Sequence, residues 1–379
     1  MDRRALLKAL AAAPVAAALP AWPASAPQRL LVLVYLYGGN DGFNTWVPYT
    51  DATYYKLRPT IAVPRDAVLK ISDRHGFHPS LAPLMPAWRA NEVALLQGVG
   101  YPEGTQQHYR DSEIAFTADD TAFRDEGWVS RALAKRVTAP CMAFDVLDIR
   151  DADPMGPYRG ERLPAAQIYW ARELLAKRRV QDCDVVTNKP GAQAIASLPP
   201  VSRSLKTAFP SDPFGEAMRA TVELAAADAA IPVIHVTLNG LDGDKHHSVD
   251  CHWKQLDYHG DALRRLAEGL AALRLGLQEI GRWDETLVAT YDEFGRSPVE
   301  NGDLGTHHGL ATTHFLMGGR VQGGLHGEAP PVERVHLVGG PAPSTDMRQV
   351  WTTVAQRWWN LDAAGLFDRR YVALDLLKT

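Results

Sequence analysis

Residues 31–42, LVLVYLYGGNDG, form a near-continuous apolar run that is broken by Gly38-Gly39 and followed by Asn40 and Asp41. Such a run favours a strand that is buried on both faces, as in a parallel sheet. Open α/β sheets bind their ligands just past the carboxyl ends of such strands. Asp41 is therefore a candidate functional residue, although Asn-Asp-Gly is also good turn chemistry in its own right.

The composition is that of an ordinary soluble protein. Of the 379 residues, 46% are hydrophobic and 22% are charged, which is enough for a large core in one or two domains. The net charge of −4 gives no global basic field that would attract nucleic acid or an anionic membrane. Three cysteines are too few for a disulfide framework. We interpret Cys251, between Asp250 and His252, as a small space-filling residue rather than a metal ligand.

The first 26 residues have the features of an export signal. Arg3-Arg4 precedes an Ala-rich apolar stretch that ends in Ala24-Ser25-Ala26, an A-x-A cleavage pattern. Paired arginines followed by an apolar pair and a lysine are typical of twin-arginine signals, although a general secretory signal is the alternative. We expect the twin-arginine export machinery to deliver the mature chain, residues 27–379, to the periplasm or the exterior as a single domain. No later apolar run approaches the roughly 20 residues that a membrane span needs.

Strands and helices are expected to alternate along the mature chain. Apolar runs predict strands at residues 30–37, 93–99, 233–238, 286–291 and 314–317. The clearest helix is 261–280, where leucines recur at spacings of three and four and Gly281 follows. A last helix is expected to start at residues 344–346. The proline-interrupted region around 140–213 predicts an irregular insertion or cap. The whole pattern indicates an α/β protein with a central, mostly parallel sheet.

Polar clusters follow several of these predicted strands. Asp41 follows the first strand, the segment 242–252 follows strand 233–238, and Asp292-Glu293 follows strand 286–291, while His307-His308 could fold back to the same sheet edge. Carboxylates together with imidazoles suit Zn, Mn or Fe, whereas Mg or Ca more often uses oxygen ligands alone. We therefore predict a metal-centred site, although histidines in exposed loops can also simply be solvated.

The chain also carries several spaced motifs. They are Gly38-Gly39-Asn40-Asp41-Gly42-Phe43-Asn44-Thr45, Arg58-Pro59-Thr60, His78-Pro79-Ser80-Leu81, His108-Tyr109-Arg110, Glu293-Phe294-Gly295-Arg296 and His308-Gly309. Together they resemble the landmarks of a bacterial family, domain of unknown function 1501 (DUF1501), with the middle region least similar. That family is usually placed in the alkaline phosphatase and sulfatase superfamily. The resemblance implies an alkaline-phosphatase-like α/β/α sandwich and one or two divalent metal ions, with Zn or Mn favoured.

Three metal ligands are implied by this resemblance. Asp41 corresponds to the metal ligand after the first strand, Glu293 stands where the superfamily has the Asp of an Asp-His-Gly motif, and His308 corresponds to the last His ligand. Phe294 replaces the His of that motif, so one ligand of the superfamily is absent.

Two segments match the Asp-x-His ligand pair of the family. Asp250 and His252 keep the spacing to His259 and to the long helix, while Asp242 and His246 keep the close approach to the preceding strand. Asp250 and His252 are preferred, with residues 241–249 as a small loop insertion.

The position of a nucleophile is less well matched. Gln107 stands where family members often have Ser, and Thr105 is the candidate hydroxyl, because a helix N-terminus there would favour an alkoxide and a bound phosphate. A helix cap is the commoner role of such a threonine. His108 and Arg110 could hold the non-bridging oxygens of the ester.

These features predict an exported, metal-dependent hydrolase of phosphate or sulfate esters, acting on a small-molecule or polymer substrate. The alternative is a non-catalytic binding or assembly factor with the same fold, because the nucleophile position is weakened. A Ser hydrolase is disfavoured, since no G-x-S-x-G elbow follows any predicted strand.

Overall fold

The computed structural model describes residues 29–135, 143–147, 156–158, 165–169, 185–187, 204–227, 231–239, 249–332 and 340–378. The predicted export signal, most of the predicted insertion and the alternative ligands Asp242 and His246 lie outside these residues. Within the described part of the chain, no helix is long and apolar enough to cross a membrane.

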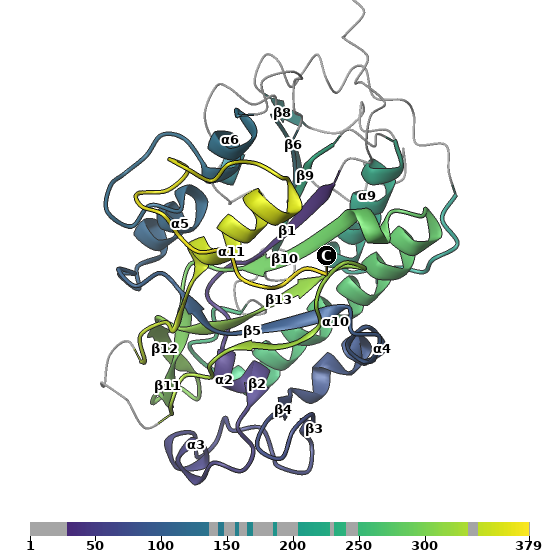
Figure 1. The fold of residues 1–379 in the computed structure, drawn as a ribbon. Coiled ribbons are helices and arrows are strands. Elements are labelled where there is room, and N and C mark those ends of the chain that lie inside the picture. Colours follow the sequence, from purple (N-terminus) through teal and green to yellow (C-terminus); the bar gives the residue numbers. More distant parts are fainter. Residues whose placement is uncertain are drawn as a thin grey trace, which may run out of the picture.

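A ten-stranded sheet runs through the centre of the molecule (Figure 1), in the order β14-β5-β13-β10-β1-β9-β6-β7-β8, with β15 paired to β5. Strand β1 lies between β9 and β10 and is parallel to both. Only β13 and β8 run antiparallel to their neighbours in this sheet, as far as the described residues show. The predicted α/β class with a central, mostly parallel sheet is therefore confirmed. The strands are β1 (Leu30–Leu36), β5 (Val93–Gly100), β6 (Ala143–Leu147), β7 (Ala165–Tyr169), β8 (Val185–Thr187), β9 (Val233–Leu238), β10 (Thr286–Tyr291), β13 (Thr312–Met317), β14 (Gly324–Gly327) and β15 (Thr345–Asp346).

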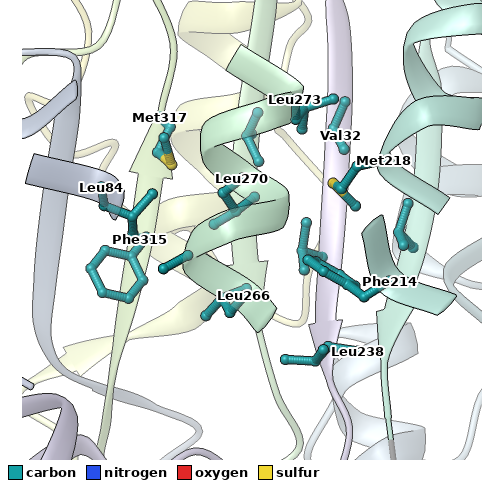
Figure 2. Close-up of a cluster of buried hydrophobic side chains, with 14 of the residues drawn as sticks. Val32, Leu84, Phe214, Met218, Leu238, Leu266, Leu270, Leu273, Phe315 and Met317 are labelled. Atoms are coloured by element: carbon teal, nitrogen blue, oxygen red, sulfur yellow. The ribbon is translucent and has the colours of Figure 1, made fainter. Parts of the chain in front are cut away.

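Helices cover both faces of this sheet. As a result, every residue of β1 is buried, and its side chains alternate between two cores. Val32 and Val34 pack in one core with α9 (Pro213–Ala227) and α10 (Gln255–Glu279). Figure 2 shows this core, where Leu266, Leu270 and Leu273 of α10 face the sheet. On the opposite face, Leu31 and Leu33 pack with α5 (His108–Thr117), α6 (Trp128–Leu133) and α11 (Met347–Thr353). The result is an α/β/α sandwich.

The leucine stripe of α10 is where the sequence places it, but the helix starts at Gln255, before the predicted start at residue 261. Its first turns bury two polar residues, Gln255 and His259, against the loop after β1. A prediction from the spacing of apolar residues misses helical turns whose buried residues are polar. At the other end, Gly281 follows the helix with a φ of 72°, as its predicted stop role requires.

The last helix also begins near its predicted start. Asp346 caps α11 and forms a capping box with Gln349, and the helix continues into a π-helical turn, Val354–Trp358. Strands β6, β7 and β8 come from the predicted insertion and extend the central sheet beyond β9.

Smaller elements surround the central sheet, and α2, β11 and β12 lie at the edge where β1, β9 and β10 end. The smaller elements are α2 (Gly42–Thr45), β2 (Trp46–Val47), α3 (Ala52–Leu57), β3 (Leu69–Lys70), β4 (Gly76–Phe77), α4 (Met85–Arg89), and the hairpin of β11 (Gly295–Glu300) with β12 (Thr306–Gly309). The register pairs Leu36 with Leu238 and Tyr35 with Tyr291, so the loops after these three strands emerge side by side.

Candidate metal centre

Four side chains from three separate segments meet at this sheet edge. His108 begins α5, Asp250 and His252 precede α10, and His308 lies on β12. One possible ligand atom from each residue lies within 4.8 Å of the others. We call these four residues the histidine–aspartate cluster.

Four separations within the cluster are close to those between the ligands of a tetrahedral metal ion. His252 Nε2 is 3.0 Å from His308 Nε2 and 3.1 Å from Asp250 Oδ1, and the distance from His308 Nε2 to the same oxygen is 3.4 Å. His108 Nε2 lies 3.5 Å from Asp250 Oδ2. A Zn²⁺ ion with ligand bonds of about 2.0–2.1 Å holds its donors about 3.3–3.4 Å apart in a tetrahedron. Three imidazoles and one carboxylate are also a donor set that Zn and Mn accept.

A close approach of two backbones places Asp250 in the cluster. Gly38 has a φ of +108°, and a Cβ at this position would lie 2.3 Å from Asp250 Cβ. Arg296 of β11 fixes the approach, since its Nη2 donates to Asp250 Oδ1 and to the carbonyl oxygen of Gly38, and its Nε donates to the carbonyl oxygen of Gly39 at 3.1 Å. A side chain at residue 38 would therefore push the Asp250 loop away from the sheet.

The tautomer of His308 is set by its second ring nitrogen. His308 Nδ1 is 2.8 Å from the carbonyl oxygen of Gln106, which can only accept a hydrogen bond. Nδ1 therefore carries the proton in the neutral ring, and the Nε2 lone pair faces Asp250 and His252. Phe294 stacks on the ring at 4.0 Å between centroids and restricts its rotation.

His108 is oriented in the same way by a carboxylate. Its Nδ1 is 3.0 Å from Glu293 Oε1, and the same oxygen accepts a hydrogen bond from the Gly38 amide at 2.8 Å. Tyr37 stacks on the imidazole at 5.8 Å between centroids. A carboxylate that holds the outer nitrogen of a histidine is the usual support of a metal-bound imidazole.

The charges of the cluster also favour a cation. Burial alone raises the pKa of Asp250, but the neighbouring histidines and the Arg296 guanidinium hold that pKa well below its usual range. Burial alone lowers the pKa of His108, yet hydrogen bonds to Asp250 and Glu293 raise it to about 9. Burial also lowers the pKa of His308 and raises that of Glu293. A proton on His108 thus supplies the positive charge that a metal ion would supply in its place.

The four side chains remain accessible to solvent. The exposed fraction is 35% for His108, 34% for His252, 22% for Asp250 and 16% for His308, whereas the Glu293 side chain is fully buried. A ligand from solution can therefore reach the cluster.

The structure brings three of the predicted metal ligands together, namely Asp250, His252 and His308, and adds His108, which was predicted to hold the ester. Glu293 lies next to the cluster, behind His108. Asp41 lies outside the cluster and pairs with Arg58.

The other two predicted catalytic residues lie near the start of α5. Thr105 is exposed, and its Oγ1 donates to Asp111 Oδ1 at 2.8 Å. Arg110 donates to the carbonyl oxygens of Ala122 and Asp119, and its guanidinium lies 4.3 Å from the centre of the Phe123 ring. Its role in binding an ester stays a prediction.

Several residues that shape the site had no role in the sequence analysis. Arg58 and Arg296 were noted only as members of motifs, and membership in a motif is the one sequence signal that marks them. Gln106 gave no signal at all, because it acts through its backbone carbonyl. Cys251, the possible metal ligand, is buried and lies outside the cluster, as a space-filling residue would.

A cavity of about 470 Å³ lies beside α2, with Gly42 and Trp46 on one side and Thr312 and Thr313 of β13 on another. None of the four cluster residues lines it. The cluster, with its convergent ligand atoms, is therefore the better candidate for chemistry.

Comparison with known proteins gives a family match over part of the chain. Residues 197–364 match the family described as "Protein of unknown function (DUF1501)", a region that includes β9, α10, β10 and the hairpin of β11 with β12. Among curated proteins, no sequence matches the chain.

Solved structures with a similar chain course include a synthase, a sulfatase and a phosphonate monoester hydrolase. The lipoteichoic acid synthase LtaP from Listeria monocytogenes is 9% identical, with a TM-score of 0.42, covering 89% of this chain and 74% of that one. The PsFucS1 sulfatase from Pseudoalteromonas sp. is 11% identical, with a TM-score of 0.42 and coverage of 92% and 71%. The phosphonate monoester hydrolase of Agrobacterium radiobacter is 12% identical, with a TM-score of 0.39 and coverage of 88% and 74%. At these identities, the activity has to be inferred from the side chains of this chain.

Proposed function

We propose that this chain is an exported, metal-dependent hydrolase of phosphate or sulfate esters, with a divalent ion held by His108, Asp250, His252 and His308. The observation that carries the proposal is the hydrogen bonding of two outer ring nitrogens. Nδ1 of His108 is bonded to Glu293, and Nδ1 of His308 is bonded to the Gln106 carbonyl, so both Nε2 atoms are presented to the cluster.

The exposure of the cluster favours a catalytic role over a structural one. Structural zinc sites are closed, whereas catalytic sites keep one position open to water or substrate. His108 and His252 are each about one-third exposed, so the cluster faces solvent on at least one side. When bound, a divalent ion supplies Lewis acidity, which polarises an ester oxygen and makes water more acidic.

The charge around the cluster favours an anionic substrate. Asp250 is the only carboxylate among the four residues, and Arg296 donates to it directly. With a divalent ion in place, the centre carries a net positive charge, which attracts the oxygens of a phosphate or sulfate group. Zn and Mn fit the three imidazoles better than Mg or Ca.

Thr105 is the proposed nucleophilic hydroxyl. It is exposed and directly precedes Gln106, whose carbonyl oxygen holds His308. The Thr105 hydroxyl donates to Asp111, a carboxylate that can accept its proton as Thr105 Oγ1 bonds to the phosphorus or sulfur atom and the ester's alkoxide leaves. The backbone amides of Thr105 and Gln106 also donate to Asp111, so this carboxylate fixes the loop in front of α5.

Export by the twin-arginine route to the periplasm or the exterior is part of the same proposal. It is supported by the paired arginines and the A-x-A pattern in the first 26 residues.

The proposal is tested by metal-dependent turnover of aryl phosphate and aryl sulfate esters. The metal-free protein is loaded separately with Zn, Mn, Mg or Ca, and the rate is compared between wild type, His308→Ala and His307→Ala. His307 is the exposed neighbour of His308 on β12, so it is a matched control. We expect turnover with Zn or Mn in wild type and in His307→Ala, and its loss in His308→Ala. Fully loaded protein without turnover on either ester class would favour a binding or assembly role.

A further inference from the structure

The carboxylate of Asp41 is saturated with hydrogen bonds from the protein itself. Its Oδ1 accepts from the amides of Phe43 and Asn44, at 3.0 and 3.2 Å, and from Arg58 Nη2 at 3.1 Å. Its Oδ2 accepts from Arg58 Nη1 at 2.5 Å and from the side-chain amide of Gln255. An ionised carboxylate offers about four lone-pair positions, so these five donors leave none for a metal ion.

Arg58 is saturated in the same way. Besides its two bonds to Asp41, Nη1 donates to Asn44 Oδ1 at 2.7 Å, Nη2 to the carbonyl oxygen of Ser297 at 2.8 Å and Nε to that of Pro298 at 2.9 Å. All five N–H groups of the guanidinium therefore have an acceptor. The ring centre of Phe43 lies 5.3 Å from the guanidinium and adds a cation–π contact.

Both partners of this ion pair are inaccessible. The side chains of Asp41 and Arg58 have no exposed surface, and Asp41 caps α2 at the end of β1. A metal ion could reach Asp41 only by displacing a guanidinium that makes two parallel bonds to the carboxylate in a buried environment.

We infer that Arg58 takes the place of a metal ion at the end of β1, so that the described part of the chain holds one divalent ion, at the histidine–aspartate cluster, and none at Asp41. This inference rests on the proposed function, because it takes the cluster to be the metal site. It departs from the family resemblance, which implies Asp41 as a metal ligand and room for a second ion.

The ion pair also connects the loop after β1 to β11, whose Arg296 donates to Asp250 of the cluster. Ser297 and Pro298, the acceptors of Arg58, directly follow Arg296, and Arg296 donates to Asp250 and to the backbone of Gly38 and Gly39. Arg58 is therefore a positioning residue for β11, and it affects the metal through Arg296 and Asp250.

Metal stoichiometry tests this inference without an activity measurement. The full chain is stripped with a chelator, titrated with Zn²⁺ or Mn²⁺ in a calorimeter, and analysed for bound metal after gel filtration. We expect one ion per chain in wild type and none in His308→Ala. Asp41→Asn is expected to keep one ion, with an affinity reduced by less than about tenfold, the smallest loss usual for residues that support a ligand directly.

Two ions in wild type, of which Asp41→Asn loses one, would overturn the inference and leave the proposed metal centre intact. No ion in wild type would overturn the metal centre and the inference together. If Asp41→Asn does not fold, the wild-type stoichiometry decides alone, since one ion supports the inference and two contradict it.

Discussion

The end of β1 and the histidine–aspartate cluster both contain an aspartate bonded to a buried arginine, yet they differ in what they can bind. Asp41 is fully buried, and every one of its acceptor positions is used by the protein. Asp250 is 22% exposed and faces three imidazoles. We therefore expect a carboxylate at this edge of the sheet to bind a metal ion only where its neighbours leave it an open coordination position.

The largest effect on stability is expected when the buried ion pair of Asp41 and Arg58 is broken. Arg58→Ala leaves the Asp41 carboxylate buried without its counter-charge, which costs about 3–5 kcal/mol of the free energy of unfolding. Urea denaturation monitored by tryptophan fluorescence measures this loss. In the double variant Arg58→Ala with Asp41→Asn, the buried charge is absent, so the loss is expected to be smaller than in Arg58→Ala. Equal stability of Arg58→Ala and wild type would show that the buried ion pair of Asp41 and Arg58 does not stabilise the protein.

In the histidine–aspartate cluster, a substitution should change metal affinity more than stability. His308→Ala removes a ligand atom, so we expect the affinity for Zn²⁺ to fall by more than about 100-fold, beyond the range seen for supporting residues. The free energy of unfolding of the metal-free protein should change less than in Arg58→Ala, because the His308 side chain is 16% exposed. His307→Ala should bind Zn²⁺ as wild type does, and a similar affinity in all three proteins would exclude His308 as a ligand.

Acid should lower the free energy of unfolding through two buried histidines near Asp41. Burial lowers the pKa of His259 to about 3 and that of His78 to about 4. In the unfolded chain both titrate near 6.5, so below that pH the unfolded state binds protons that the folded state does not. The stability from each histidine is complete above about pH 6.5 and falls by about 2 kcal/mol on going to pH 5.

Urea denaturation of the metal-free protein at about pH 7.5 and about pH 5 measures this effect, with His259→Gln as the comparison. Since glutamine does not titrate, the variant should lose less stability on acidification than wild type. An equal loss in both proteins would show that His259 does not contribute to the pH dependence.

A smaller effect, on metal affinity, is expected from Glu293, which is hydrogen-bonded to the outer ring nitrogen of His108. Glu293→Gln keeps an acceptor for His108 Nδ1 but removes the negative charge, so we expect about a tenfold loss of Zn²⁺ affinity. Glu285→Gln is a control, since Glu285 lies before β10 and pairs with Arg282 at 3.0 Å. If both variants bind Zn²⁺ equally well, the carboxylate of Glu293 does not support the metal.

Much of the fold follows directly from local sequence patterns. Strands β9 and β10 have the predicted bounds, and β1 ends within one residue of its predicted end, because each is an apolar run buried on both faces. The early start of α10 could not be predicted, since Gln255 and His259 are buried by contacts with the distant loop around Asn40 and Asp41.

The candidate site divides in the same way. Strand ends and histidine-rich segments predicted a metal site at the sheet edge where the histidine–aspartate cluster lies. The family resemblance implied Asp250, His252 and His308 as ligands, together with Asp41 and Glu293, which lie outside the cluster. The ion pair of Asp41 with Arg58 could not be deduced from the sequence. Arg58 is held in place by hydrogen bonds to the carbonyl oxygens of Ser297 and Pro298, which are far away in sequence. A carboxylate looks the same in a sequence whether a guanidinium or a metal ion faces it.

Anomalous diffraction from a crystal of the zinc-loaded protein locates each metal ion at its own position, so it directly distinguishes the histidine–aspartate cluster from Asp41 as the metal site. We expect one peak, about 2.0–2.2 Å from Nε2 of His108, His252 and His308 and from a carboxylate oxygen of Asp250, with Asp41 still bonded to Arg58. A peak at Asp41, or no peak at the histidine–aspartate cluster, would contradict this expectation.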